Sequence, residues 1–355
     1  MRRDIIHIDG SPLYLDAELA HLKNFLTSSS YSFYVVIADE NTHRLCFPKI
    51  KDILPSTHSV ITFPSGEKNK NLHTCESLWR ELLNQKIDRK ALAILLGGGV
   101  TGDMGGFIAS AYKRGIDFIH VPTTLMAMTD SSIGGKLGID FDNIKNAIGL
   151  FHKPKAIFIH TPFLSTLPDH EMWSGFSEIV KHALIADNVL FRLLPGSLGH
   201  TRPLINHEIL YQSILVKKTL VERDPLESSV RKALNFGHTI GHAIESAVMA
   251  SGNVMTHGEA VALGMIVETY ISFRSGLILK DHHDTIQSLL GKICNPEKIG
   301  KIDRSRLSDF ILNDKKNESG RVLFSLLTGI GSFSINKDVP PSIIEEGLDY
   351  LYRWD

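Results

Sequence analysis

Ala91-Leu-Ala-Ile-Leu-Leu96 runs directly into Gly97-Gly98-Gly99-Val100-Thr101-Gly102-Asp103, so an apolar segment of strand length ends in a glycine-rich loop. Backbone N–H groups at the start of a helix bind anions, because they lack intrahelical partners and lie at the positive end of the helix dipole. Glycine also lets the backbone approach a phosphate closely. The stretch therefore predicts a strand, a phosphate-binding turn and a helix.

Short apolar runs recur on both sides of this loop, and segments with helical spacing separate them. Strands are predicted at 33–38, 59–63, 91–96, 117–121 and 156–160, with a helix over 72–85. Alternating strands and helices favour a parallel sheet with helices on both faces. The first part of the chain is therefore predicted to be a Rossmann-like α/β nucleotide-binding domain.

The spacing of apolar residues changes after the proline-bounded stretch 162–168. Apolar residues then recur at helical spacing over 171–187, 204–223, 231–250 and 258–275. We expect an α/β protein with a parallel-sheet nucleotide-binding domain over 1–165 and a mainly α-helical domain over 166–355.

The composition is typical of a globular enzyme. The chain has 355 residues, 43% hydrophobic and 22% charged, with a formal net charge of -1. Such a length suits two domains with separate cores, and two domains imply a cleft. The near-neutral charge gives no electrostatic basis for binding nucleic acid or an anionic membrane.

Cysteine usage and the N-terminus predict a cytoplasmic protein. Cys46, Cys75 and Cys294 are too few and too widely spaced for a disulfide framework or a CxxC zinc site. Residues 1–7 lack the apolar core of a signal peptide, and no apolar run approaches the ~18 residues of a membrane span.

The glycine loop satisfies the G-x-G-x-x-G pattern through Gly97, Gly99 and Gly102. A ribose-binding acidic residue is expected about twenty residues later, but the next predicted strand ends in Val121-Pro-Thr-Thr124. Ribose contacts must then come from elsewhere, and the candidates are Asp39, Asn41, Glu67 and Lys70. The alternative is that the glycines only form a tight turn.

Histidines of the second half form a candidate metal site. His238 and His242 are four residues apart, so on a helix their imidazoles share a face. His257 and Glu178 are the natural completions of a site with three protein ligands and an open position, which is typical of catalytic zinc. Spacing alone leaves open which of His238 and His242 is the ligand, and both could instead be satisfied histidines of a semi-buried helix.

Basic and amide side chains beside glycine or acidic residues form a candidate anion site. Taken singly, each is more often solvated surface. Lys136 follows two glycines, and Arg231 precedes Asn235 and His238 by about one and two turns of a predicted helix. The set implies a small polyanionic substrate, and its members are Arg114, Lys136, Lys145, Asn146, Lys181, Lys217, Arg231, Lys315 and Lys316.

Read together, these segments resemble the 3-dehydroquinate synthase family of the shikimate pathway over nearly the whole chain. The resemblance rests on ordered motifs: GGGVTGDMGGFIA at 97–109, PTTL at 122–125, DSSIGGK at 130–136, KNAIGLFHKPKA at 145–156, LPDHE at 167–171, GFSEIVKHAL at 175–184, LNFGHTIGHAIE at 234–245, HGEAVALGM at 257–265 and DKK at 314–316. It implies a dehydroquinate synthase-like fold, a homodimer, and an active site in the cleft between the domains.

The resemblance also implies roles for individual residues. Glu178, His238 and His257 match the metal ligands, for zinc or cobalt. The positions matching the NAD site are Asp39, Asn41, Glu67, Lys70, Gly98, Gly99, Val100, Asp103, Thr123, Thr124, Asp130, Lys136 and Lys145. The positions matching the substrate pocket are Asp130, Lys136, Lys145, Asn146, Lys181, Lys217, Arg231, Asn235, His242 and Lys315 or Lys316. Arg114 matches an arginine that reaches the substrate phosphate of the neighbouring subunit.

The implied reaction converts 3-deoxy-D-arabino-heptulosonate 7-phosphate to 3-dehydroquinate and phosphate. It proceeds by transient NAD oxidation, phosphate elimination, re-reduction, ring opening and intramolecular aldol closure. Departures from the family pattern occur at Leu137, Met128-Thr129 and Pro225. Three alternatives remain: a sister sugar phosphate cyclase of the 2-deoxy-scyllo-inosose or valiolone type, a metal-dependent polyol dehydrogenase, or an inactive NAD-binding module.

Overall fold

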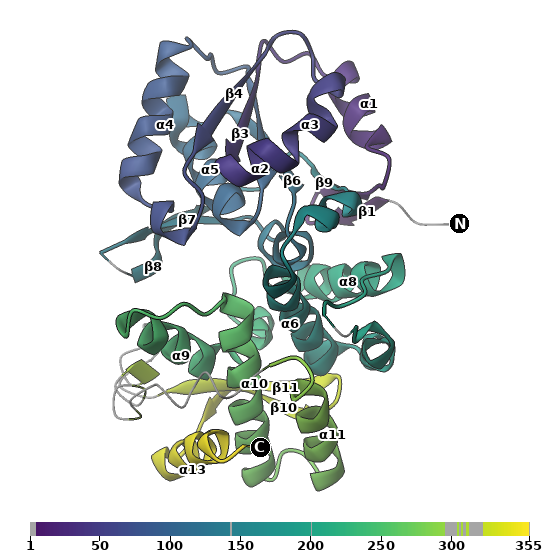
Figure 1. Ribbon diagram of the computed structural model, residues 1–355, viewed down its shortest axis with the longest axis vertical. Coiled ribbons are helices and arrows are strands. Elements are labelled where there is room, and N and C mark those ends of the chain that lie inside the picture. The colour runs from purple at the N-terminus through teal and green to yellow at the C-terminus, as the bar shows by residue number, and fades with distance from the viewer. Residues whose placement is uncertain are drawn as a thin grey trace. The chain divides into compact units, whose positions relative to one another are not determined.

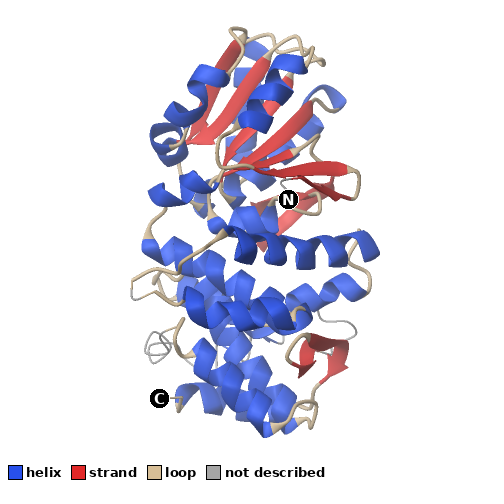
Figure 2. Ribbon diagram, turned by 90° about the vertical axis from the view of Figure 1, so that its right-hand side faces the viewer, coloured by secondary structure: helices blue, strands red, loops and turns tan. Residues whose placement is uncertain are grey.

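The chain forms two compact units, Met1–Pro168 and Asp169–Asp355. The computed structural model describes residues 5–142, 144–199, 201–294, 304, 307, 310, 311 and 322–354. Figure 1 traces the chain through both units, and Figure 2 shows strands gathered in the first and helices dominating the second. The assignment of NAD to the first domain and of metal and substrate to the second stays a prediction.

The first unit is built on a largely parallel sheet. In the described part of the chain its strands are β1 (Ile5–Ile8), β2 (Ser11–Leu15), β3 (Tyr34–Asp39), β4 (His58–Phe63), β5 (Leu92–Gly97), β6 (Asp117–Pro122) and β9 (Ile157–Ile159). They lie in the order β1-β2-β9-β6-β5-β3-β4, and every neighbouring pair is parallel except β1 with β2. The predicted parallel sheet is confirmed, and the sequence had not indicated β1 and β2.

Helices cover both faces of this sheet, as predicted. They are α1 (Ala20–Ser28), α2 (Glu40–Leu45), α3 (Phe47–Ile50), α4 (Leu72–Asn84) and α5 (Gly99–Ala111). Val35 and Ile37 point to one face, where they share a buried cluster with residues of α4 and α5. Tyr34 points to the other face, where its hydroxyl donates to the Leu26 carbonyl of α1. Figure 1 shows α1 and α4 on opposite sides of the strands.

An antiparallel hairpin, which the sequence did not indicate, packs against α5. It consists of β7 (Lys136–Phe141) and β8 (Ile144–Phe151). Gly138 and Gly149 face each other across it and interrupt the apolar alternation by which a strand is detected. Its inward side chains Leu137 and Ile139 join the core cluster.

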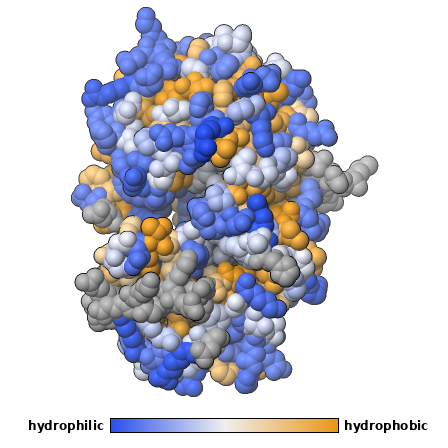
Figure 3. All heavy atoms as spheres, viewed as in Figure 1, coloured by the Kyte–Doolittle hydropathy of each residue, from blue (hydrophilic) through white to orange (hydrophobic). Residues whose placement is uncertain are grey.

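In the view of Figure 3, apolar and polar side chains are interspersed over the visible face.

The strand order reverses between β3 and β5. The chain passes from β3 to β4 on one side and from β5 to β6 on the other, so the segments that follow β3 and β5 diverge. In open α/β sheets such a switch point leaves a crevice outside the carboxyl ends of the strands, where ligands bind. The glycine loop and the start of α5 lie at this edge.

The second unit is mainly helical. Its described elements are α6 (Asp169–Ala186), α7 (Asn188–Leu193), α8 (His207–Arg223), α9 (His238–Ala250), α10 (His257–Arg274), α11 (Lys280–Leu290), α13 (Pro341–Tyr352) and the hairpin strands β10 (Leu323–Gly329) and β11 (Ser332–Asp338). Helix α10 packs against α6, α9, α11 and α13, and most of its residues are buried. None of the helices in the described part of the chain combines the length and apolar character that a membrane span requires.

The continuous helix predicted over 231–250 is wrong. Val230–Asn235 forms a 3-10 helix, and α9 starts anew at His238 after Gly237, whose φ is 78°. This left-handed conformation favours glycine and ends any helix that approaches it. Arg231 and His238 therefore lie on separate elements, although the helices predicted over 171–187, 204–223 and 258–275 are confirmed within a few residues.

Glycines bring the backbone of α10 against two neighbouring helices. A Cβ atom on Gly264 would overlap the Gly237 carbonyl oxygen and lie 2.7 Å from the Gly241 nitrogen, at the start of α9. A Cβ atom on Gly258 would overlap the Ser174 carbonyl oxygen of α6. Neither helix can approach α10 this closely if a larger residue occupies these positions.

Gly264→Ala is therefore expected to destabilise the protein by about 1–3 kcal/mol. The added methyl group meets backbone atoms of Gly237 and Gly241, which cannot rotate away as a side chain can. The measurement is the free energy of unfolding in urea. Gly196→Ala is the matched control, since a Cβ atom there meets nothing within 4 Å. Equal stability of the two variants would contradict the role assigned to this helix contact.

Candidate active site

The glycine loop and the Thr123–Thr124 loop lie side by side at the carboxyl ends of β5 and β6. The Thr123 amide donates to the Gly97 carbonyl at 2.9 Å, and a Cβ atom on Gly98 would lie 2.8 Å from Thr124 Cγ2. Gly98 precedes the first turn of α5, whose leading N–H groups have no intrahelical acceptor. The predicted cofactor residues of these two loops therefore come together around a helix N-terminus that suits a pyrophosphate.

Helix α5 sits close to the sheet because small residues face the strands. A Cβ atom on Gly102 would lie 3.4 Å from the His120 ring, and one on Gly105 would lie 2.8 Å from Leu95 Cδ2. Burial lowers the pKa of His120 to about 4, so the ring beneath the loop is neutral. Gly105 thus lets α5 pack close to the sheet, whereas a Cβ atom on Gly102 would make only an ordinary van der Waals contact with the His120 ring.

Asp39 ends β3 and is fixed beside the same loop. Its Oδ1 accepts the amides of Asn41 at 2.9 Å and Thr42 at 3.0 Å, which caps α2. Its Oδ2 accepts the hydroxyls of Thr42 at 2.7 Å and of Thr101, in the first turn of α5, at 3.4 Å. The capping bonds hold the carboxylate at the switch point, where we had expected a ribose contact; that contact itself stays a prediction.

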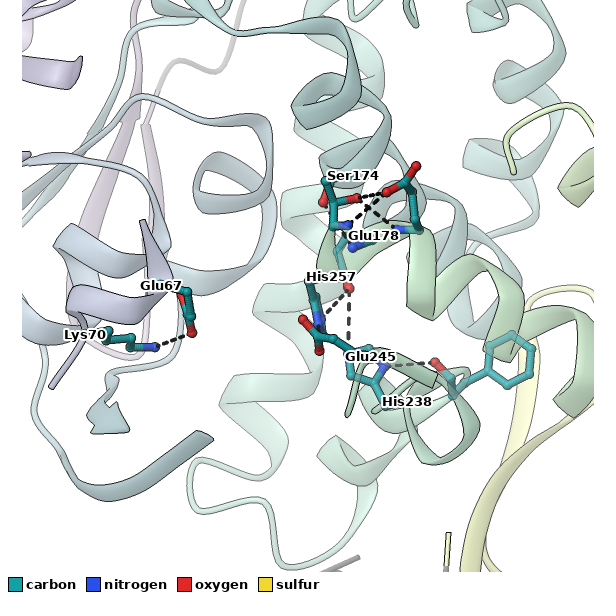
Figure 4. Close-up of polar contacts among 11 residues, drawn as sticks. Glu67, Lys70, Ser174, Glu178, His238, Glu245 and His257 are labelled. Atoms are coloured by element: carbon teal, nitrogen blue, oxygen red, sulfur yellow. Dashed lines mark hydrogen bonds and ion pairs between the residues drawn. The ribbon is translucent and has the colours of Figure 1, made fainter. Parts of the chain in front are cut away.

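Lys70 joins three parts of the first unit. Its Nζ lies 2.6 Å from Asp103 Oδ2 of α5 and 2.6 Å from Asn146 Oδ1 of β8. It also lies 4.0 Å from Glu67 Oε1 (Figure 4). Burial lowers the pKa of Lys70, but the carboxylates of Asp103, Glu67 and Asp140 outweigh it, so the net pKa is raised and the ammonium persists. Residues predicted separately for NAD and for substrate thus form one network.

The other predicted residues of the first unit lie on several different elements. Val100 is in the first turn of α5. Asp130 lies in a π-helical turn over Ala127–Ser131, Lys136 begins β7 and Lys145 lies on β8. Arg114 follows α5 in a 3-10 turn with φ of 68°.

Glu178 is the centre of the second cluster. It lies on α6 with a side chain only 1% exposed, and its Oε2 forms an ion pair with Lys181 one turn away. Its Oε1 lies 3.7 Å from His238 Nε2 and 3.8 Å from His257 Nε2, and it has no hydrogen-bond partner among the described residues. A buried carboxylate oxygen thus faces two imidazole nitrogens from α9 and α10 (Figure 4).

The far nitrogen of each imidazole has an acceptor. His238 Nδ1 lies 3.1 Å from the Phe236 carbonyl oxygen, and His257 Nδ1 lies 3.3 Å from Glu245 Oε2. A neutral imidazole that donates from Nδ1 presents a lone pair at Nε2. One carboxylate oxygen and two nitrogen lone pairs then converge, and this donor set and its outer partners fit a divalent ion such as zinc.

His242 lies one turn beyond His238 on α9. Its ring centroid is 5.2 Å from that of His238 and 5.7 Å from that of His257. One nitrogen from each of these three histidines lies within 4.8 Å of the others, so His242 is also within reach of a shared ion. The approach of Glu178 favours His238 and His257 as the nitrogen ligands.

Glu268 fixes the start of α9. This fully buried residue of α10 accepts the Gly237 amide at Oε2, 2.6 Å away, and the Ile240 amide at Oε1, 3.1 Å away. A carboxylate at a helix N-terminus binds unpaired amides and is favoured by the helix dipole. Glu268 therefore anchors the turn that carries His238, a role that sequence reasoning missed.

Arg231 is fully buried. Asp224 holds the segment 225–231, here called the Arg231 loop, which leads into the 3-10 helix Val230–Asn235. Asp224 Oδ2 accepts the amides of Ser229 at 2.7 Å and Arg231 at 3.0 Å, and Arg231 Nη1 donates to the Pro225 carbonyl at 2.7 Å. Glu227 lies 3.8 Å from Arg231 Nε and accepts from Asn235 Nδ2 at 3.1 Å. The backbone carbonyl of Pro225 thus helps to position Arg231.

The remaining predicted cations fall into two groups. Lys181 of α6 and Lys217 of α8 are buried, with exposures of 1% and 6%. Lys315 and Lys316 lie outside the described residues.

The residues that sequence reasoning missed, namely Asp224, Glu227, Glu245 and Glu268, have in common that they hold a predicted residue in place.

Comparison with known proteins assigns the chain to a family. Residues 60–174 match the model of the 3-dehydroquinate synthase N-terminal domain, and residues 175–317 match that of its C-terminal domain. The chain belongs to the 3-dehydroquinate synthase family. The 3-dehydroquinate synthase of Parabacteroides distasonis is 36% identical over 341 residues, which cover 94% of this chain and 95% of the relative.

Solved structures confirm the dehydroquinate synthase-like fold. A 2-epi-5-epi-valiolone synthase from Streptomyces hygroscopicus with NAD+ and Zn2+ bound matches with a TM-score of 0.82 and 25% identity, over 100% of both chains. A 2-deoxy-scyllo-inosose synthase complexed with carbaglucose-6-phosphate, NAD+ and Co2+ has a TM-score of 0.84 at 24% identity, covering 98% of this chain and 99% of its own. The 24% match bears on the fold alone.

The anchoring of the Arg231 loop predicts a pH-dependent stability. Burial alone would raise the pKa of Asp224, but hydrogen bonds from the amides of Ser229, Arg231 and Ser228 outweigh it and lower the pKa from 3.8 to about 2. A depressed carboxyl pKa contributes stability that is complete above the unfolded pKa and is lost as the pH falls through the folded one. The pH window is therefore about 4 down to about 2.

Asp224→Asn is expected to lower the free energy of unfolding by about 1–3 kcal/mol near neutral pH. The difference from the parent protein shrinks as the pH falls from 4 toward 2, because the parent carboxyl then becomes protonated as well. Urea unfolding at several pH values measures it, with exposed Asp52→Asn as the control. A difference that grows on acidification would contradict the account.

Proposed function

We propose that this chain is a 3-dehydroquinate synthase, which converts 3-deoxy-D-arabino-heptulosonate 7-phosphate to 3-dehydroquinate and phosphate with NAD and a divalent ion. The observation that carries the proposal is the convergence of Glu178 Oε1 with the Nε2 atoms of His238 and His257. The glycine loop at the start of α5 and the identity to named 3-dehydroquinate synthases over almost the full length support it.

The two cofactors supply the redox and acid chemistry of this reaction. When bound, NAD supplies reversible hydride acceptance at C5 of the substrate, and a zinc or cobalt ion supplies polarisation of the neighbouring oxygens. Glu178, His238 and His257 are the residues that hold the ion. The amides at the start of α5, with Thr123 and Thr124, hold the pyrophosphate of NAD.

The substrate carries a carboxylate and a phosphate, and the chain offers cations for both. We assign the carboxylate to Arg231 and Lys217, because a guanidinium grips a carboxylate through parallel hydrogen bonds. We assign the phosphate to Lys136 and Asn146. Arg231 is fully buried and its Nη1 is hydrogen-bonded, so its side chain loses little conformational freedom when the substrate binds.

Proton transfer at the substrate is assigned to His242. Histidine is the residue that most often serves as a general acid or base, and His242 lies next to both proposed nitrogen ligands. The phosphate that leaves is a second acceptor for the proton removed from C6. Because the hydride returns to C5, the proposed reaction has no net redox change.

The assembly and location of the protein are finer parts of the proposal. We infer a homodimer in which Arg114 reaches the substrate phosphate of the neighbouring subunit, on the strength of the family resemblance. A cytoplasmic location rests on cysteine usage, since Cys46, Cys75 and Cys294 are all free.

Substrate turnover tests the proposed reaction. We expect heptulosonate phosphate to release one phosphate per molecule consumed, with no build-up of NADH, and we expect a chelator to abolish the release until zinc is restored. Phosphate release and NADH absorbance are followed in the same sample. Net NADH would instead favour a polyol dehydrogenase, and activity confined to other sugar phosphates would favour a sister cyclase.

Alanine variants of the three histidines test the metal assignment. His238→Ala and His257→Ala are each expected to lose zinc at micromolar protein, because a three-ligand site cannot spare one ligand. His242→Ala is expected to retain zinc and lose most of its turnover. Equilibrium dialysis measures the zinc content, and zinc loss in His242→Ala with retention in His238→Ala would reverse the assignment.

A further inference from the structure

We propose that Glu245 is a positioning residue that holds the imidazole of His257 in the orientation needed to bind the metal ion. This inference rests on the proposed metal site. Glu245 lies on α9 and His257 is the first residue of α10, so the contact joins the two helices (Figure 4). Its Oε2 lies 3.3 Å from His257 Nδ1.

His257 needs such a partner more than His238 does. His238 Nδ1 meets the carbonyl of Phe236, two residues earlier, so its own backbone orients that ring. The side chain of His257 is 33% exposed, compared with 12% for His238, so it is less constrained by packing. The Glu245 carboxylate, only 11% exposed, supplies to His257 the acceptor that the backbone supplies to His238.

The contact with Glu245 determines which nitrogen of His257 carries the lone pair. Because Nδ1 donates to Glu245, the lone pair of His257 lies at Nε2, which is the nitrogen 3.8 Å from Glu178 Oε1. A carboxylate acceptor also makes the imidazole a stronger ligand than a neutral acceptor does. Glu245 therefore acts on the metal through His257.

The backbone of His257 is fixed independently of Glu245. Thr256 and Glu259 form a reciprocal capping box at the start of α10, in which the Thr256 amide donates to Glu259 Oε2 at 2.8 Å. The loss of Glu245 is therefore expected to free the ring without unwinding the helix. This separation allows metal affinity to be measured apart from folding.

The test is the zinc affinity of metal-free protein, measured by competition with a chromophoric chelator at one pH. Glu245→Ala is expected to weaken zinc binding by about 10–100-fold, which is usual for loss of an outer-shell partner. Glu245→Gln is expected to lose less, because its amide oxygen can still accept from Nδ1. Glu245→Asp keeps the charge at a shorter reach and is expected to recover part of the affinity.

Two further measurements separate positioning from stability. The melting temperature of the metal-free protein and its affinity for NAD are expected to be unchanged in Glu245→Gln. Glu222→Ala, which removes an exposed carboxylate of α8 paired with Lys218, is the matched control and should leave zinc affinity unaltered.

The outcomes distinguish this inference from the proposed function. Parent protein that binds zinc tightly beside Ala and Gln variants of Glu245 with unaltered affinity would overturn the role of Glu245 alone. Parent protein that binds no zinc would overturn the metal site as a whole. If Glu245→Ala fails to fold, Glu245→Met, which keeps much of the side-chain volume but has no oxygen acceptor, carries the test, and zinc affinity equal to the parent in that variant contradicts the proposal.

Discussion

The second unit depends on the contact of the α10 backbone with the backbones of α6 and α9. Gly258 and Gly264 permit this contact, because any Cβ atom at either position would overlap a carbonyl oxygen of the neighbouring helix. Glu178, His238 and His257 come from these three helices, one from each. Metal–ligand distances tolerate only about 0.2 Å, so a helix displaced by the size of a methyl group could not share an ion with the other two. Close packing without side chains between the helices is thus what makes a common site geometrically possible.

The charged groups of both units are held before any ligand arrives. Lys70 is held by Asp103 and Asn146, the Arg231 loop by Asp224, and the start of α9 by Glu268. A buried charge without partners would be strongly unfavourable, so each such group needs hydrogen bonds that also fix its direction. The cost of orienting the polar groups is therefore met during folding. An enzyme that binds a sugar with two anionic groups together with two cofactors benefits from a site with little left to reorganise.

The sequence predicts the strands and helices that are apolar throughout or strictly periodic. Strands β3, β5 and β6 and helices α4 and α6 fall within a few residues of their expected bounds, because buried elements leave a strong local signal. The hairpins β7–β8 and β10–β11 were missed, and the helix expected over 231–250 is broken at Gly237. The site follows the same rule. The spacing of His238 and His242 is visible in the sequence, whereas the pairing of Glu245 with His257, or of Glu268 with Gly237, exists only once two helices have packed.

In the proposed reaction, NAD serves as a catalyst while phosphate is eliminated. The most direct test is the fate of deuterium placed at C5 of the heptulosonate phosphate during turnover with unlabelled NAD and zinc. We expect 3-dehydroquinate to keep the deuterium at the corresponding carbon, because the same hydride leaves and returns within one turnover. Loss of the label from the product, with its appearance in free NADH, would contradict it.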